Sequence, residues 1–115
     1  PLPSNIFMKP GDATKEEMIK ETKKGILVTR FWYVRTVHAK TVSITGMTRD
    51  GTWYIENGEI KYPVRNLRFT DSLLRTYANI DLITKDVKRL GSYYGGMVLP
   101  GIKVSKFLFT GITKY

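Results

Sequence analysis

The sequence predicts an α+β fold, built as a mostly antiparallel β-sheet or partial barrel with two short helices at its side. Aromatic residues make up 12% of the chain and gather with β-branched residues in short runs, which favours strands. An Asn-Gly pair between two alternating runs indicates a hairpin. The length of 115 residues, with 42% hydrophobic and 25% charged residues, predicts that residues 1–115 form a single domain.

The first helix follows an extended lead-in that the prolines and Gly11 predict for residues 1–13. Thr14 and Glu17 have the spacing of a capping box, which predicts a helix over residues 15–24. Gly25 then fits the left-handed position that ends many helices.

Three strands are predicted next, and a turn joins the last two of them. Residues 26–34 are apolar or aromatic on both alternate faces, which is typical of a central strand that is covered on both sides. Residues 41–47 alternate, with Val42, Ile44 and Gly46 on one face. Residues 49–51 (Arg-Asp-Gly) are expected to turn the chain into the next strand, residues 52–56.

The Asn57-Gly58 pair is the strongest local signal, and it predicts a two-residue type I′ hairpin. The turn sets the expected pairs, which are Glu56 with Glu59, Ile55 with Ile60, Tyr54 with Lys61, and Trp53 with Tyr62. One apolar face, expected to be buried, then contains Trp53, Ile55, Ile60 and Tyr62. Pro63 has no N–H to donate, so this strand is predicted to lie at a sheet edge or to end there.

The second half of the chain continues with short elements. A strand is predicted over residues 64–69, and Asp71 or Ser72 can cap a helix over roughly residues 72–80. The helix has an apolar stripe at Leu73, Leu74, Tyr77 and Ile80. Residues 81–90 look strand-like in part, residues 91–96 are predicted to form a loop, and residues 102–110 the last strand.

The composition excludes several classes of chemistry. The chain has no cysteine, so disulfides, thiolate metal sites and a thiol nucleophile are impossible. No apolar run is long enough to cross a bilayer and no signal peptide is evident, so we expect a cytoplasmic protein without membrane contact. The chain opens at Pro1 without an initiator Met, which suggests a fragment of a longer protein.

The charge is strongly basic, with 19 Lys and Arg and a formal net charge of +9. Such a balance can mark a nucleic-acid surface, and a small basic nucleic-acid-binding β-domain is the alternative function. The basic residues are, however, scattered without a run of five. The densest group, Lys20, Lys23 and Lys24, is expected at a helix end, where positive charge suits the helix dipole. A solvated basic surface is therefore the preferred interpretation.

No residue is assigned a catalytic, metal-binding or cofactor-binding role. Glu56 and Glu59 meet at the hairpin tip, but a solvated tip offers nothing to tune a carboxyl pair. His38 is the only histidine and has no carboxylate within six residues, whereas zinc needs three or four convergent ligands. The glycines at positions 91, 95, 96 and 101 match no phosphate loop. Tyr93 and Tyr94 are expected either to contact a partner or to pack in a turn.

Two aromatic tracts are unusual for a domain of this size. Residues 31–33 (Phe-Trp-Tyr) and 107–109 (Phe-Leu-Phe) place large apolar groups on both faces of a strand. A small domain cannot cover all of them, so another domain or subunit is expected to cover part of this surface.

Several stretches resemble the C-terminal region of TldD/PmbA proteins. The most specific is residues 51–64 (GTWYIENGEIKYPV), followed by residues 25–29 (GILVT) and 96–104 (GMVLPGIKV). Residues 29–33 and 63–69 are similar to a PmbA-like subgroup. The resemblance runs in order through nearly the whole chain.

This resemblance implies a longer protein with an N-terminal α/β domain and a C-terminal β-rich domain that associates into dimers. It also implies that TldD-type subunits are zinc-dependent peptidases acting on unfolded peptides, with a helical His-Glu-x-x-x-His motif and a further Cys ligand near a Cys-Gly. PmbA-type subunits lack the helical motif and act as partners. The family's older name, modulator of DNA gyrase, does not imply DNA binding.

This chain departs from the catalytic pattern. It contains no His-Glu-x-x-x-His, and Tyr94-Gly95 stands where the resemblance places the Cys-Gly. We therefore expect a PmbA-like chain without its own zinc or catalytic residues. Its predicted role is a scaffold, peptide-cleft or subunit-interface domain for a homo- or hetero-oligomer, with the edge formed by residues 53–64 as a candidate for binding an unfolded peptide. An active metallopeptidase is a third hypothesis, which requires stoichiometric zinc.

Overall fold

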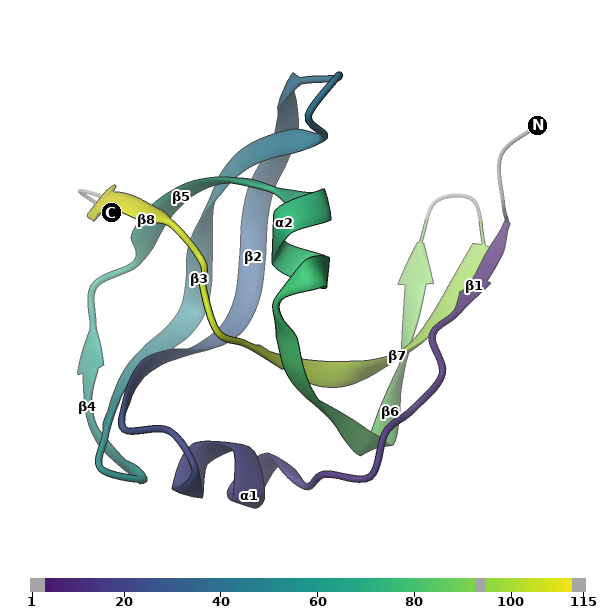
Figure 1. Ribbon diagram of the computed structural model, residues 1–115. Coiled ribbons are helices and arrows are strands. Elements are labelled where there is room, and N and C mark those ends of the chain that lie inside the picture. The colour runs from purple at the N-terminus through teal and green to yellow at the C-terminus, as the bar shows by residue number, and fades with distance from the viewer. Residues whose placement is uncertain (1–3, 93–94, 113–115) are drawn as a thin grey trace.

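The computed structural model describes residues 4–92 and 95–112, which form two open sheets and two short helices (Figure 1). The larger sheet has the order β2-β3-β5-β8, with β4 also paired to β3, and the smaller has the order β1-β7-β6. The strands are β1 (Asn5–Phe7), β2 (Lys24–His38), β3 (Ser43–Glu56), β4 (Glu59–Val64), β5 (Leu67–Ser72), β6 (Ile80–Ser92), β7 (Gly95–Val104) and β8 (Phe109–Ile112), and the helices are α1 (Lys15–Lys20) and α2 (Leu73–Ala78).

This arrangement confirms the predicted α+β class. Every strand pair is antiparallel except β1 with β7, which is parallel. Because both sheets stay open over the described residues, the antiparallel sheet is the observed form of the prediction and the partial barrel is not. Figure 1 shows the two sheets as separate groups of strands, with α2 running between them and α1 below.

Helix α1 begins as the capping box predicts but ends early. The Thr14 side chain accepts a hydrogen bond from the Glu17 N–H at 3.1 Å, and Met18 is buried. The helix ends at Lys20 rather than at residue 24, because the next carbonyls bind the hairpin tip instead of continuing the helix. Gly25 lies inside β2 without a positive φ, so its predicted left-handed role is wrong.

The β3–β4 hairpin confirms the predicted turn. Asn57 has φ 50° and Gly58 φ 79°, the two positive values that a type I′ turn requires. The Glu56–Glu59 and Ile55–Ile60 pairs are as predicted. Strand β4 pairs only with β3 in the described chain, as expected for an edge strand with a proline near its end.

The remaining hairpin pairs are wrong by one residue. Tyr54 pairs with Tyr62 and Trp53 with Pro63, because a bulge places Lys61 as an extra residue on β4. A turn sequence fixes only the first pairs and cannot reveal a bulge further along. The predicted buried face is consequently split. Its members differ in burial: Ile55 is buried, Trp53 is half-buried, and Ile60 and Tyr62 are exposed.

Strand β2 is an edge strand, and the predicted central position is wrong. Within residues 4–92 and 95–112 it pairs with β3 alone, while β4 and β5 both pair with β3 on its other side. Every residue from 29 to 38 is exposed. The expected turn at residues 49–51 is also wrong. Asp50 (φ 63°) and Gly51 (φ 116°) form an irregularity inside one continuous β3, which the Arg30–Asp50 ion pair at 2.9 Å holds to β2.

In the second half, Ser72 is the observed cap of α2, which ends at Ala78. The predicted strand over residues 64–69 begins only at Leu67, and β6 is one strand rather than two pieces. The predicted strand over residues 102–110 is wrong, because β7 ends at Val104 and β8 begins at Phe109. Of the predicted loop over residues 91–96, the ends belong to β6 and β7, and residues 93–94 lie outside the described residues.

The core lies under the larger sheet, where Phe69 is 1% exposed. Its ring is 5.0 Å from that of Phe31 and 5.2 Å from that of Phe107. Strands β2 and β5 and the connection between β7 and β8 therefore meet at one aromatic cluster. On β3, the buried hydroxyls of Thr48 and Thr52 lie 2.6 Å apart. No helix in the described part of the chain is long and apolar enough to span a membrane.

Candidate functional site

Glu56 and Glu59 pair across the hairpin tip, as the turn predicted. Both residues are exposed, and Glu59 forms an ion pair with Lys61 at 3.0 Å. A general acid–base pair needs an enclosing cleft that shifts its pKa values. The exposed hairpin tip provides no such cleft, so we assign this pair no catalytic role.

His38 lies at the other end of the sheet, at the exposed end of β2. Its Nδ1 is 3.1 Å from the Thr41 hydroxyl, which is 2.7 Å from the Ser43 hydroxyl. These contacts close the β2–β3 connection. The donor set does not fit zinc, since the described residues contain no group of three or more His, Cys, Asp or Glu that could hold a metal ion. We therefore derive no chemical step through zinc in this chain.

The two tyrosines that were expected to contact a partner, Tyr93 and Tyr94, lie outside the described residues. Tyr94 is also the residue that stands where the resemblance places the family's Cys ligand. Gly95 and Gly96 begin β7, and Gly101 lies within it, with its N–H bound to the Thr84 hydroxyl at 2.8 Å. These glycines therefore belong to a strand and not to a phosphate-binding loop.

The residues of the first aromatic tract are all exposed, but their rings have different partners. The Phe31 ring, on a residue that is 44% exposed, lies 5.0 Å from the ring of the buried Phe69, whereas the rings of Trp32 and Tyr33 lie 5.4 Å from each other. Tyr33 is 61% exposed, and its neighbours Val34 and Val37 are exposed as well. We call residues 32–37 together with Arg49 the distal β2 surface.

Two arginines complete this surface. The Arg49 guanidinium lies over the Trp32 ring, 4.1 Å from its centroid, and that of Arg35 lies 4.9 Å from the centroid of Tyr33. Both contacts are within the range of cation–π attraction. The sequence did not single out either arginine, since Arg49 comes from β3 and reaches Trp32 only through the strand pairing.

Further apolar side chains are exposed on α2 and after β7. Leu74 and Tyr77, two members of the predicted helical stripe, are 62% and 55% exposed. In the second aromatic tract, Phe107 and Phe109 are half-buried and in ring contact, while Leu108 is exposed. The expectation that this chain cannot cover its own apolar residues is therefore confirmed for its described part.

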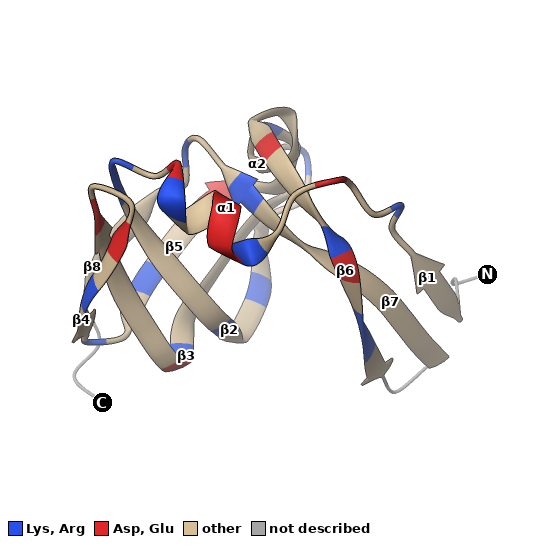
Figure 2. Ribbon diagram, turned by 90° about the horizontal axis from the view of Figure 1, so that it is seen from below, with Lys and Arg blue, Asp and Glu red and all other residues tan. Residues whose placement is uncertain are grey.

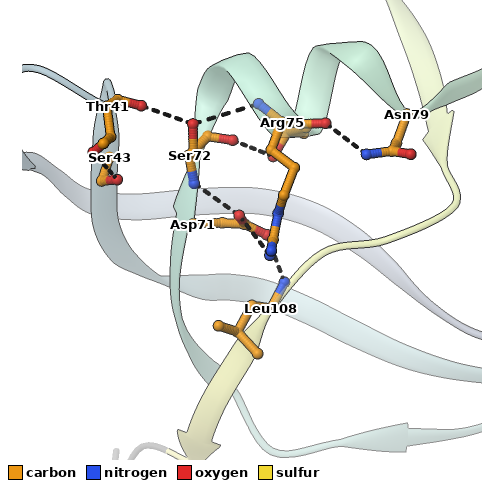
Figure 3. A network of polar contacts seen from close by, with 8 residues as sticks. Thr41, Ser43, Asp71, Ser72, Arg75, Asn79 and Leu108 are labelled. Carbon is orange, nitrogen blue, oxygen red and sulfur yellow. Dashed lines mark hydrogen bonds and ion pairs between the residues drawn. The ribbon is translucent and has the colours of Figure 1, made fainter.

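A polar network holds α2 against the rest of the larger sheet (Figure 3). Asp71 accepts hydrogen bonds from the Leu108 N–H at 2.9 Å and the Ser72 N–H at 2.7 Å, and pairs with Arg75 at 2.9 Å. Burial raises the pKa of the Asp71 carboxyl, but the bonds from Arg75 and the two N–H groups outweigh burial and lower it. Ser72 also donates to the Thr41 carbonyl at 2.7 Å.

Charge is distributed over the whole molecule. Figure 2 shows Lys and Arg on strands of both sheets and on α1, with Asp and Glu interspersed. A nucleic-acid surface usually gathers its cations on one face or stripe. The distribution therefore favours the solvated basic surface that the sequence predicted.

The fold and its surface define a β-rich domain, with exposed aromatic and basic groups and without a recognisable catalytic constellation among its described residues. Residues 1–111 match the PmbA/TldA metallopeptidase C-terminal domain, and the chain belongs to this family. The family that the sequence predicted is thereby confirmed.

The relatives of this chain are longer proteins. It is 32% identical over 85 residues to a zinc metalloprotease TldD homolog of Saccharolobus solfataricus, covering 71% of this chain and 18% of that protein. It is 30% identical over 93 residues to the metalloprotease PmbA of Escherichia coli O157:H7, covering 78% and 20%. The chain thus spans about a fifth of the length of these relatives.

Solved structures share the fold. TldE from Thermococcus kodakarensis superposes with a TM-score of 0.75 at 16% identity, over 91% of this chain and 23% of that one. A protein proposed to modulate a DNA gyrase, from Thermotoga maritima, superposes with a TM-score of 0.70 at 26% identity, with the same coverage of 91% and 23%.

Proposed function

We propose that this chain is a scaffold and subunit-interface domain of a TldD/PmbA-type metallopeptidase system, and that it supplies no catalytic residue itself. The observation that carries the proposal is the exposed distal β2 surface, where Trp32, Tyr33 and two valines lie on an edge strand. Contiguous exposed apolar side chains of this kind mark interaction sites. Trp, Tyr and Arg are also the residues that most often dominate interface energies.

The size of the relatives supports this role. About four fifths of each relative's chain lies outside the region matched here. Leu74 and Tyr77 on α2 then form a second exposed apolar position against which such further chain can pack. The proposed role is therefore to carry contacts to other domains and to a second subunit in a homo- or hetero-oligomer, in the cytoplasm.

Native mass spectrometry of the complete protein that contains this chain tests the proposal. We expect an oligomer, and we expect the double variant Trp32→Ala/Tyr33→Ala to shift it toward monomer. The matched control is Leu90→Ala, an exposed apolar residue on β6 of the other sheet. A monomeric protein, or an oligomer equally stable in the double variant, contradicts the interface role.

Peptide binding is a second proposed function, supported by the free edge of β4. This strand pairs only with β3 among the described residues, and Ile60 and Tyr62 on it are exposed. An extended peptide can add to such an edge through backbone hydrogen bonds, with side chains setting selectivity. Pro63 limits the ladder at one end.

The probe for this function is a fluorescein-labelled, unstructured decapeptide of Thr and Val, followed by anisotropy. We expect Ile60→Ser and Tyr62→Ser to weaken its binding, and Val87→Ser, an exposed substitution on β6, to leave it unchanged. Equal binding of the decapeptide to all three variants would exclude β4 as the peptide-binding edge.

A further inference from the structure

Four side chains on the distal β2 surface form one continuous row. Arg49 stacks on Trp32 at 4.1 Å, Trp32 contacts Tyr33 at 5.4 Å between centroids, and Arg35 stacks on Tyr33 at 4.9 Å. We call this series the cation–aromatic row. Its two ends are cationic, its middle is aromatic, and all four residues are exposed.

The backbone is bent to build this row. Trp32 pairs with Met47 and Arg35 with Thr45, so Tyr33 and Val34 together lie opposite Gly46. Tyr33 has φ 56°, a left-handed value that is rare for an aromatic residue. Strained residues of this kind concentrate where a surface has a function, which motivates a functional interpretation of the bulge.

Gly46 makes the bulge possible. It is buried, and a Cβ built on it would lie 3.0 Å from the Phe69 ring and 3.1 Å from the Trp32 carbonyl oxygen. Gly46, which lies opposite the bulged pair, therefore packs directly on the aromatic core. This packing holds the backbone at the bulge in place, and the backbone conformation there sets the direction of the exposed Trp32 and Tyr33 rings.

Neither arginine of the row is neutralised within the described chain. The ion pairs there are Arg30–Asp50, Lys61–Glu59 and Arg75–Asp71. Asp50, the residue next to Arg49, is already paired with Arg30 at 2.9 Å. A guanidinium stacked on a ring keeps its in-plane N–H groups free to bind a carboxylate in a bidentate manner.

We propose that the cation–aromatic row binds an acidic segment of a partner subunit. Two carboxylates of that segment engage Arg35 and Arg49, and an apolar or aromatic side chain between them covers Trp32 and Tyr33. This inference rests on the proposed interface function and names the chemistry of its partner. The net charge of +9 favours an acidic partner over a basic one.

Protein carboxylates fit this row better than nucleic-acid phosphates do. The exposed valines Val34 and Val37 offer apolar contact, which a phosphate backbone does not use. Nucleic acid is therefore kept as an outcome of the test.

The test measures the affinity of the complete protein for three labelled probes by anisotropy. These are an acidic dodecapeptide of repeated Glu-Tyr-Glu-Val, its basic counterpart with Lys in place of Glu, and a twelve-nucleotide oligothymidylate. We expect the acidic peptide to bind tightest. Arg35→Gln and Arg49→Gln should each weaken it by about two- to fivefold, the upper range of an exposed ion pair.

Controls separate this site from general electrostatics. Arg89→Gln removes the same charge from an exposed position on β6 and should leave the affinity unchanged. Arg49→Glu should weaken the acidic peptide further and strengthen the basic one. Equal binding of both peptides, an unchanged affinity in the two Gln variants, or a preference for the oligothymidylate would each overturn the proposal.

Native mass measurement of the Arg35→Gln/Arg49→Gln double variant separates the two proposals. If its oligomer is as stable as the parent's while Trp32→Ala/Tyr33→Ala dissociates, the interface function stands and the acidic partner does not. If both double variants leave the oligomer unchanged, the interface lies elsewhere and both proposals fail.

Discussion

The Asp71 carboxylate accepts the N–H of Leu108 at 2.9 Å and so joins the end of β5 to the start of β8, 37 residues later. The same carboxylate binds Arg75 on α2, and its side chain is 2% exposed. One buried group thus holds together β5, the helix α2 that follows it directly, and the distant residue Leu108.

Asp71→Asn should lower the free energy of unfolding by about 1–3 kcal/mol, because an amide cannot accept from both Leu108 and Arg75 in this geometry. Urea unfolding followed by circular dichroism measures the change. Asp81→Asn, at an exposed position on β6, is the matched control and should have little effect.

Asp71 also predicts the pH dependence of stability. Its folded-state pKa lies below the ordinary value of 3.8, so ionised Asp71 stabilises the fold above that pH. This contribution is lost as the pH falls through the lower folded-state pKa. Unfolding curves between neutral and acidic pH should therefore show a steeper acid loss in the parent than in Asp71→Asn. Parallel curves would contradict this account.

Gly58→Ala should destabilise the chain by about 1–3 kcal/mol through strain at a left-handed position. Gly58 has φ 79°, and an added Cβ would lie 2.6 Å from the Lys20 carbonyl oxygen. Its N–H also binds the Thr22 carbonyl at 2.8 Å, which ties the hairpin to the end of α1. Gly91→Ala is the control, since nothing lies within 4 Å of its added Cβ. Thermal unfolding of both variants measures the difference.

Phe69→Ala should be the most destabilising of these substitutions, by about 3–5 kcal/mol, because it leaves a cavity among packed rings. Phe69 contacts both Phe31 and Phe107, and it is almost fully buried. Trp32→Ala on the surface should change the free energy of unfolding far less. If chemical denaturation shows the two variants to be equally destabilised, Trp32 belongs to the core and not to an interface.

Thr48→Val preserves shape but removes a buried hydroxyl. That oxygen accepts the Leu67 N–H at 2.9 Å and lies 2.6 Å from the Thr52 hydroxyl. The variant leaves a backbone donor unpaired, which should cost about 1–3 kcal/mol. Hydrogen exchange at Leu67 should accelerate in Thr48→Val and remain unchanged in Thr110→Val, an exposed position on β8.

The sequence predicted local features best. The Thr14 cap, the Asn57-Gly58 turn and the Ser72 cap all depend on residues within three or four positions of one another, and the structure confirms each. The family likeness was equally accessible, since it rests on contiguous stretches that match residues 1–111.

The sequence-based predictions were wrong where the structure depends on contacts between segments that are distant in the sequence. Whether residues 26–34 are central or at an edge depends on which side of β3 the strands β4 and β5 join. The shift at Lys61 and the bulge at Tyr33 depend on strand pairing, which periodicity does not encode.

The sequence by itself therefore determined the family, the α+β class, the hairpin turn and the excess of aromatic residues, because each is written in neighbouring residues or in composition. Only the tertiary structure decided which partner each aromatic ring has. Pairing across β3 brings the Phe31 ring against the buried Phe69 and leaves Trp32 and Tyr33 between two arginines. Side-chain exposure is a property of the assembled sheet, and the cation–aromatic row exists only once β2 and β3 are aligned.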